Sequence, residues 1–235
     1  MRKKIYLLAN SQGTSLGVKR VQIYPFLLQR MLPEYEFHFL IVTGWSVQEI
    51  HQNLENVFLV QPDLVIFQIG IIECARRILS DKAKTLFYAL PLGRSITKVI
   101  HDHRGFAIRL RNRLNLNYRK VGPRAFELAL QAICAELNEK GIRYVFLETP
   151  FFSDLYESKF FPLINEDIRI YNNVMKPYYS TPILTESDDS IWQTGTVHFN
   201  EKGHRIVAEQ IKRLILKWQF ESEDGSLSMS KERSV

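Results

Sequence analysis

Short and almost continuous apolar runs alternate with longer amphipathic stretches along most of the chain. Strands that are apolar throughout and separated by helices are typical of a parallel sheet covered on both faces. The pattern therefore predicts an α/β protein, a three-layer α/β/α domain with a five-stranded parallel sheet over residues 1–220. The strands are expected at residues 4–10, 36–42, 64–70, 144–149 and 182–185, and the helices at 17–31, 123–140, 165–175 and 200–218.

Individual residues predict where several of these elements begin and end. Pro33 ends the first helix, because proline cannot continue a helix. Ser46, with Glu49 three residues later, has the spacing of a capping box and predicts another helix start. Gly141 follows the 123–140 stretch and is expected to cap its carboxyl end.

Two stretches depart from the strand–helix alternation. Residues 71–120 are expected to form a basic helical insertion, which we interpret as a lid or, through residues 93–120, as an oligomerisation arm. Between positions 93 and 120 there are eight basic residues against one acidic residue, Asp102. Such charge fits either a solvated helical face or a guide for an anionic substrate or cofactor. Residues 221–235 are polar and serine-rich, which predicts a disordered tail.

Composition narrows the classes of protein to consider. The chain of 235 residues is 46% apolar and 24% charged, as is ordinary for a globular protein. It has no apolar run of ~18 residues and no signal-peptide cleavage pattern, so we expect a cytoplasmic protein without a membrane span. Cys74 and Cys134 lack metal-site spacing and are expected to be small buried side chains in a reducing compartment. No nucleotide fingerprint or nucleic-acid motif is present, so we expect no cofactor, no metal and no nucleic-acid partner.

Ser11 and His198 are the residues whose placement suggests chemistry. Ser11 follows the first predicted strand, and the reactive crevice of an open parallel sheet lies at the carboxyl ends of its strands. His198 stands in a loop before the last predicted helix, from which its ring can face the same strand ends. A serine hydroxyl needs a base to become a nucleophile, and histidine suits that task near neutral pH. A purely structural role for a loop serine is the alternative.

A second serine motif is a competing signal. Gly13-Thr14-Ser15-Leu16-Gly17 matches the Gly-x-Ser-x-Gly elbow of α/β-hydrolases. That elbow lies deep within a sheet, and too few residues precede Ser15 to supply the strands it requires. We therefore interpret Ser15 as a helix cap. Gly13 and Gly17 are expected to allow a tight turn and close helix packing.

Four blocks of the sequence resemble, in order and spacing, the motifs of the SGNH (GDSL-like) hydrolases. Ser11 falls on the serine of Gly-Asp-Ser, Gly44 on the glycine after the second strand, and His198 on the histidine of Asp-x-x-His. Gly70-Ile71-Ile72-Glu73 falls on Gly-x-Asn-Asp. The blocks span nearly the whole chain. This resemblance implies a flavodoxin-like α/β/α esterase fold with Ser11 as nucleophile and His198 as base.

The resemblance also implies an oxyanion hole, but two of its usual residues are replaced. The family's donor asparagine is Ile72 here, so the oxyanion would be held by the backbone N–H groups of Ser11, Gly44 and Gly70. The family's aspartate three residues before the histidine is Gly195. His198 would then be oriented by Asp188 or Asp189, by a backbone carbonyl, or by no group.

Further residues are candidates for lining the substrate pocket: Asn10, Gln12, Glu73, Arg76 and Arg77. The two arginines would suit a carboxylate, a phosphate or a pyrophosphate, although solvated helix positions are an equal alternative. The run Gly-Ile-Ile-Glu-Cys-Ala-Arg-Arg resembles runs in bacterial members of the family linked to surface polysaccharides, which points to a carbohydrate.

Three functions follow as hypotheses. The first is a serine esterase that removes an acyl group, expected to be acetyl, from a carbohydrate or another small ester. The second is an acyltransferase to a glycan, in which the basic insertion binds an acyl carrier such as coenzyme A. The third is a catalytically impaired domain that binds a glycan or serves in an assembly through residues 93–120.

Overall fold

The computed structural model of the chain describes residues 2–76, 103–114, 119–184 and 187–223, and between the first two ranges also residues 85–86, 89–90 and 95. Two sequence-based interpretations lie largely outside these residues. The first is the 71–120 insertion, most of which is not described, so its role as a lid or oligomerisation arm stays a prediction. The other is the tail: the last helix continues to Glu223, and residues 224–235 are not described.

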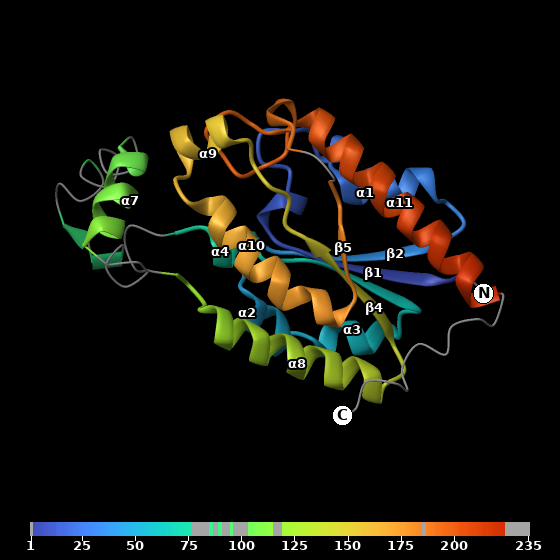
Figure 1. Cartoon of the computed structure of the whole chain (residues 1–235). Coiled ribbons are helices and arrows are strands. Elements are labelled where there is room, and N and C mark those ends of the chain that lie inside the picture. Colours follow the sequence, from blue (N-terminus) through green and yellow to red (C-terminus); the bar gives the residue numbers. More distant parts are fainter. Residues whose placement is uncertain are drawn as a thin grey trace.

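The centre of the protein is the predicted five-stranded parallel sheet (Figure 1). Its strands lie in the order β2-β1-β3-β4-β5, and every neighbouring pair is parallel. The α/β prediction is therefore confirmed. The strands are β1 (Lys4–Ala9), β2 (Glu36–Ile41), β3 (Leu64–Gln68), β4 (Arg143–Glu148) and β5 (Ser180–Pro182).

Helices cover both faces of the sheet (Figure 1). On one face α1 packs against the long α11, and on the other α8 packs against α2 and α10. The bounds of these helices are α1 (Tyr24–Met31), α2 (Val47–Gln52), α8 (Pro123–Glu139), α10 (Ile164–Met175) and α11 (Glu201–Glu223); shorter helices are α3 (Glu55–Val60), α4 (Ile71–Cys74), α7 (Arg104–Arg113) and α9 (Asp154–Phe160). Within the described part of the chain, no helix combines the length and apolar character needed to cross a membrane.

The core lies between the sheet and the two helical layers. All five residues of β3 are buried, which explains the continuous apolar run that predicted this strand. Phe67 of β3 and Phe146 of β4 stack with their ring centroids 4.9 Å apart. Cys74 and Cys134 are both free and buried, as predicted.

Several element boundaries differ from the sequence-based expectation. The first helix begins at Tyr24 rather than at residue 17, because Ile23 is extended and Pro25 occupies the first turn. Residues Arg20–Gln22 form only a 3-10 turn. The last strand is Ser180–Pro182, two residues earlier than expected, where it pairs with the carboxyl half of β4. The capping box of Ser46 and Glu49 is present as predicted.

Candidate active site

The polar residues singled out in the sequence gather at the carboxyl ends of the strands. Ser11 follows β1, Gly44 follows β2 and Gly70 follows β3, and their strands are neighbours in the sheet. The backbone N–H of Asn10 donates to the carbonyl of Gln68 at 3.2 Å, which ties the end of β1 to the end of β3. The fold therefore brings these three positions to one edge of the sheet, where parallel sheets form their binding crevices.

Ser11 begins a short 3-10 turn, Ser11–Gly13, that directly follows β1. Asn10 caps this turn through its Oδ1, which accepts the Gln12 N–H at 3.1 Å. The hydroxyl of Thr14 donates to the Ser11 carbonyl at 2.6 Å. At Gly13 a Cβ would stand 2.8 Å from the Cβ of Ala9, so only glycine lets the turn fold this closely onto β1, as predicted. The Ser11 hydroxyl itself donates to no other described residue.

Gln12 connects this turn to the loop that carries His198. Its Nε2 donates to the Val197 carbonyl at 3.1 Å, and its Oε1 accepts from Gln68. The Oε1 of Gln68 in turn accepts the Tyr24 hydroxyl at 3.0 Å. These buried amides fix the His198 loop against the end of the sheet. Gln12 was expected to line the pocket, but it is only 1% exposed and acts beneath the site.

His198 contacts the backbone of Ser11, so the two residues expected to act as base and nucleophile are neighbours. Burial lowers the pKa of the imidazole below its usual value, and an interaction with the Ser11 backbone opposes this shift in part. The histidine is therefore neutral at pH 7, the form that can accept a proton. Its Nδ1 is buried and has no hydrogen-bond partner among the described residues.

The two aspartates proposed to orient His198 bind other groups. Asp188 forms an ion pair with Lys202 at 3.0 Å. Its pKa is lowered to about 2, first by the Ser190 hydroxyl and then by Lys202. Asp189 accepts hydrogen bonds from the backbone N–H of Ser153, at 3.3 Å, and from its hydroxyl. Neither carboxylate hydrogen-bonds the imidazole, so the expectation of an orienting aspartate is not supported by the contacts.

A tyrosine that the sequence did not single out holds the His198 loop instead. The Tyr156 hydroxyl lies 2.8 Å from the Gln193 carbonyl and 2.9 Å from the Thr196 carbonyl, and it accepts the Thr196 N–H at 3.1 Å. The Thr196 hydroxyl accepts the His198 N–H at 3.1 Å. Tyr156 belongs to α9, an element that carried no motif, so no sequence signal pointed to it.

Three backbone N–H groups suit an oxyanion hole. Those of Ser11, Gly44 and Gly70 donate to no other residue in the described ranges. Gly44 and Gly70 have φ angles of +83° and +104°, which glycine adopts readily. A Cβ at Gly70 would also lie 2.6 Å from the Thr149 hydroxyl. Ile72, at the family's asparagine position, packs against the apolar core.

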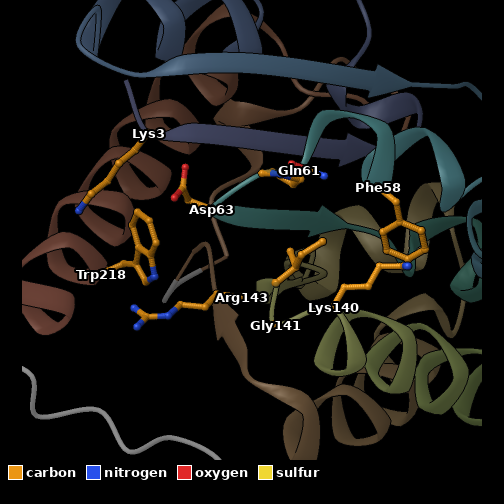
Figure 2. A pocket seen from close by; sticks show the side chains of 10 residues that line it. Lys3, Phe58, Gln61, Asp63, Lys140, Gly141, Arg143 and Trp218 are labelled. Carbon is orange, nitrogen blue, oxygen red and sulfur yellow. The ribbon is translucent and has the colours of Figure 1, made fainter. Parts of the chain in front are cut away.

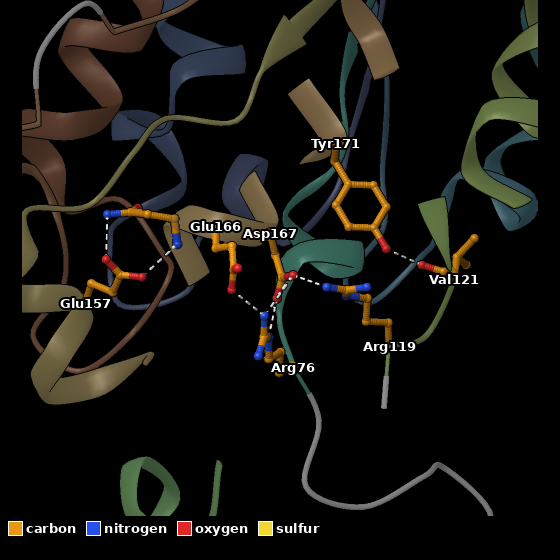
Figure 3. A network of polar contacts seen from close by, with 8 residues as sticks. Arg76, Arg119, Val121, Glu157, Glu166, Asp167 and Tyr171 are labelled. Carbon is orange, nitrogen blue, oxygen red and sulfur yellow. Dashed lines mark hydrogen bonds and ion pairs between the residues drawn. The ribbon is translucent and has the colours of Figure 1, made fainter. Parts of the chain in front are cut away.

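Glu73 and Arg76 are placed differently from the pocket positions expected of them. Glu73 is 1% exposed and accepts the Val47 N–H at 2.8 Å, so it lies under the loop that carries Gly44. Arg76 binds the carboxylates of Asp167 and Glu166 on α10 (Figure 3). Its charge is thus balanced within the protein. Arg77, the other arginine proposed to bind an anion, lies outside the described residues.

Ser15 does not cap a helix, contrary to the interpretation of the second serine motif. Lys19 and Ile23 stand at the cap positions of the next two elements. Ser15 is exposed in a turn, in which its carbonyl accepts the Val18 N–H at 3.3 Å. Gly17 has a φ of +73° there, in agreement with the predicted tight turn.

Two larger cavities lie away from Ser11 and His198. One of about 650 Å³ is at the amino-terminal ends of the strands, where Lys3 and Arg143 flank Trp218 (Figure 2). The other, about 890 Å³, lies between β4, β5 and α11. Neither is lined by Ser11, Gly44, Gly70 or His198. Among the described residues, no three histidine, cysteine or acidic side chains are grouped so that they could hold a metal ion.

No family model and no curated protein matches this sequence. Solved structures do match. A psychrotrophic esterase, EstA, from Pseudoalteromonas sp. is 10% identical, with a TM-score of 0.59 over 92% of this chain and 98% of that one. A member of the lipolytic protein G-D-S-L family from Veillonella parvula is 15% identical, with a TM-score of 0.56 over 90% and 97%. An acetylxylan esterase from Geobacillus stearothermophilus is 13% identical, with a TM-score of 0.55 over 90% and 93%.

These solved structures share this protein's sheet and helical layers at very low sequence identity. Each of them covers about nine-tenths of the chain. The chain has the fold of the SGNH (GDSL-like) esterases and lipases.

Proposed function

We propose that the protein is a serine esterase that removes an acyl group, most simply acetyl, from a carbohydrate or another small ester. The observation that supports this proposal is the juxtaposition of Ser11 and a neutral His198 at the carboxyl end of the sheet. The acetylxylan esterases among the structures of the same fold favour a carbohydrate ester.

The reaction begins with a proton transfer. His198 takes the hydroxyl proton of Ser11 while the serine oxygen forms a bond to the ester carbonyl carbon. The backbone N–H groups of Ser11, Gly44 and Gly70 hold the oxyanion of the tetrahedral intermediate. The ester C–O bond then breaks, and the protonated His198 gives its proton to the leaving alcohol. A water molecule, deprotonated by His198, hydrolyses the acyl-serine in the same way.

His198 has no carboxylate partner in the part of the chain that the structure describes, which sets an expectation for the rate. In a well-studied serine protease, replacement of the triad aspartate lowers kcat by about 10⁴. A histidine that no carboxylate orients should therefore support slow turnover. The contacts of Tyr156 and Gln12 with the His198 loop would offset part of this loss in rate by fixing the loop backbone.

Two features of the candidate site favour a second function, that of a glycan-binding domain without catalysis. Nδ1 of His198 has no partner among the described residues, and Ile72 offers no side-chain donor to an oxyanion. Such a protein would bind an acylated glycan at the strand ends and leave its ester intact.

The test is hydrolysis of p-nitrophenyl acetate and of acetylated xylo-oligosaccharides by the wild type and by Ser11→Ala. We expect Ser11→Ala to lose turnover while circular dichroism shows an intact fold. Ser15→Ala is the matched control, because it removes an exposed hydroxyl four residues away, and it should retain full activity. Unchanged turnover in a folded Ser11→Ala protein would exclude the esterase mechanism. A wild type that binds the oligosaccharides without hydrolysing them would support the binding domain.

A further inference from the structure

The loop of residues 43–47, which carries Gly44, is held by charged side chains from other parts of the chain. Gly44 lacks a side chain, has a positive φ, and has no atom within 4 Å of where a Cβ would stand. A glycine in open space does not by itself hold its N–H in one direction. An oxyanion donor must be aligned before the reaction, so this loop needs external contacts.

Lys120 supplies one of these contacts. Its Nζ donates to the Gly44 carbonyl at 2.8 Å and pairs with the Glu49 carboxylate at 2.6 Å. The same oxygen of Glu49 accepts the backbone N–H of Ser46 at 2.7 Å and its hydroxyl at 2.8 Å. Lysine, carboxylate and helix cap therefore form one continuous chain of charge-assisted hydrogen bonds, which are stronger than neutral ones.

Glu73 supplies the second contact, at the other end of the loop. Its Oε1 accepts the backbone N–H of Val47, the first residue of α2, at 2.8 Å. Glu73 lies in α4, three residues after Gly70, so the same short helix follows one oxyanion donor and supports the loop of another. The loop is thus fixed at its carbonyl side by Lys120 and at its last N–H by Glu73.

The position of Lys120 in the sequence connects this loop to the basic insertion. Arg119, the residue before it, binds Asp167 on α10 (Figure 3). Asp167 also binds Arg76, the last residue of the first described range of the chain. The buried carboxylate of Asp167 therefore joins Arg76 and Arg119, the residues that flank the segment 77–118. Lys120, which follows Arg119, binds the Gly44 loop.

We propose that Lys120 and Glu73 are positioning residues that align the Gly44 N–H for the oxyanion, and that Lys120 makes this alignment depend on how the ends of the insertion are anchored at Asp167. Neither side chain needs to touch the substrate. The inference rests on the proposed esterase function, because it assigns Gly44 a role in the oxyanion hole.

The size of the expected effect follows from the chemistry of such donors. Complete removal of one donor from an oxyanion hole lowers kcat by about 10²–10³, and a misplacement of about 1 Å can cost 10²-fold. Loosening the Gly44 loop should therefore lower kcat by roughly 10- to 100-fold. KM should change little, because the substrate ground state does not require the oxyanion contact.

The experiment compares Lys120→Met with the wild type by ester hydrolysis and by amide hydrogen exchange. Methionine keeps an unbranched chain close to the length of the lysine methylenes but lacks the ammonium group. We expect kcat for p-nitrophenyl acetate to fall by roughly 10- to 100-fold, and exchange in residues 43–47 to become roughly tenfold faster, the equivalent of one lost charge-assisted hydrogen bond. Arg124→Met is the matched control, because Arg124 forms an exposed ion pair with Glu127 on α8. It should change neither quantity.

Glu73→Gln provides a readout that a purely structural role would not give. Burial raises the pKa of the Glu73 carboxyl to about 7, although the nearby charge of Lys120 acts to lower this pKa. Tyr171 on α10 and Cys74 on the same helix as Glu73 are other titratable groups that interact with it. Glutamine accepts the Val47 N–H without a charge, as the protonated carboxyl does, and it does not titrate, so Glu73→Gln should show the lower kcat of the protonated form throughout. In the wild type, kcat should fall as Glu73 gains a proton below pH 7. In Glu73→Gln this limb should be absent, and the remaining acid limb should lie at lower pH, where His198 is protonated.

The outcomes separate this inference from the proposed function. A wild type without esterase activity would exclude the function, and hydrogen exchange would still decide whether Lys120 and Glu73 hold the loop. If the amide hydrogens of residues 43–47 exchange in Lys120→Met at the wild-type rate and kcat also keeps its wild-type value, the inference is overturned. The same conclusion follows for Glu73 if the acid limbs of the wild type and Glu73→Gln coincide.

Discussion

His198, the proposed base, has no carboxylate partner among the described residues. In a triad, an aspartate on Nδ1 fixes the tautomer and stabilises the imidazolium that forms during proton transfer. Here Nδ1 is buried without a partner among the described residues, and burial lowers the pKa. The neutral base is therefore favoured, whereas its protonated form is stabilised less than in a triad. The sequence showed that Gly195 replaces the family's aspartate and left Asp188, Asp189, a backbone carbonyl or no group as the alternatives; the two aspartates bind Lys202 and Ser153 instead.

His204 has a different role, which depends on its remaining neutral. It is 1% exposed, and its Nδ1 accepts the Tyr24 backbone N–H at 3.3 Å. Burial, and to a smaller extent His198, lowers its pKa to about 4.

We expect His204 to make the protein acid-labile. Its pKa is lower in the folded state than the unfolded value of about 6.5, so its contribution is complete above pH 6.5 and is lost as the pH falls toward 4. The difference of about 2.5 pKa units corresponds to about 3 kcal/mol. Asparagine can accept the same backbone N–H without titrating. Between pH 6.5 and 4, urea denaturation should show the free energy of unfolding of the wild type falling by about 3 kcal/mol more than that of His204→Asn. Parallel pH dependences would contradict this role.

At the scale of elements, the His198 loop is organised by a helix distant from it in sequence. Tyr156 of α9 satisfies backbone groups of Gln193 and Thr196, and Gln12 satisfies Val197 from the turn after β1. Two separate elements thus hold the backbone of this loop.

Tyr156→Phe tests the importance of this contact. The ring should keep its packing against Phe152, with centroids 5.4 Å apart, while the loop loses the hydroxyl that its backbone groups share. We expect kcat to fall by about tenfold with KM nearly unchanged, because the base is displaced rather than the substrate. The acid limb of the pH profile should not move, since the hydroxyl bonds the loop backbone and not the imidazole. Tyr179→Phe, at an exposed position, is the control. Equal rates for the wild type and Tyr156→Phe would contradict the role.

The extent to which elements could be predicted from sequence varies for physical reasons. Strands β1 and β3 were predicted closely because their burial on both faces leaves continuous apolar runs. The start of α1 was predicted seven residues too early, because residues 17–23 carry amphipathic spacing without forming an α-helix. Strand β5 has three residues and none is fully buried, so its pattern carries little information.

At the scale of the whole molecule, alternation along the chain predicted the five-stranded parallel sheet. The family-like blocks placed Ser11, Gly44 and Gly70 after the first three strands and His198 in the loop before the last helix, where the structure has them. The contacts that support the site were not predictable in this way. Lys120 reaches the Gly44 loop across 76 sequence positions, and Arg119 reaches Asp167 across 48. No local spacing encodes such long-range pairs, which form only when the layers pack.

The most direct test is covalent labelling of the purified protein with a fluorophosphonate, read as intact mass. Such a probe reacts with an activated serine whatever the natural substrate is. We expect the wild type to gain one phosphonyl group, and Ser11→Ala and His198→Ala to gain none. Labelling that persists in Ser11→Ala would locate the reactive residue elsewhere, with Ser15 the first to examine. A folded wild type that stays unlabelled while a known serine esterase is labelled in the same solution would contradict an activated Ser11.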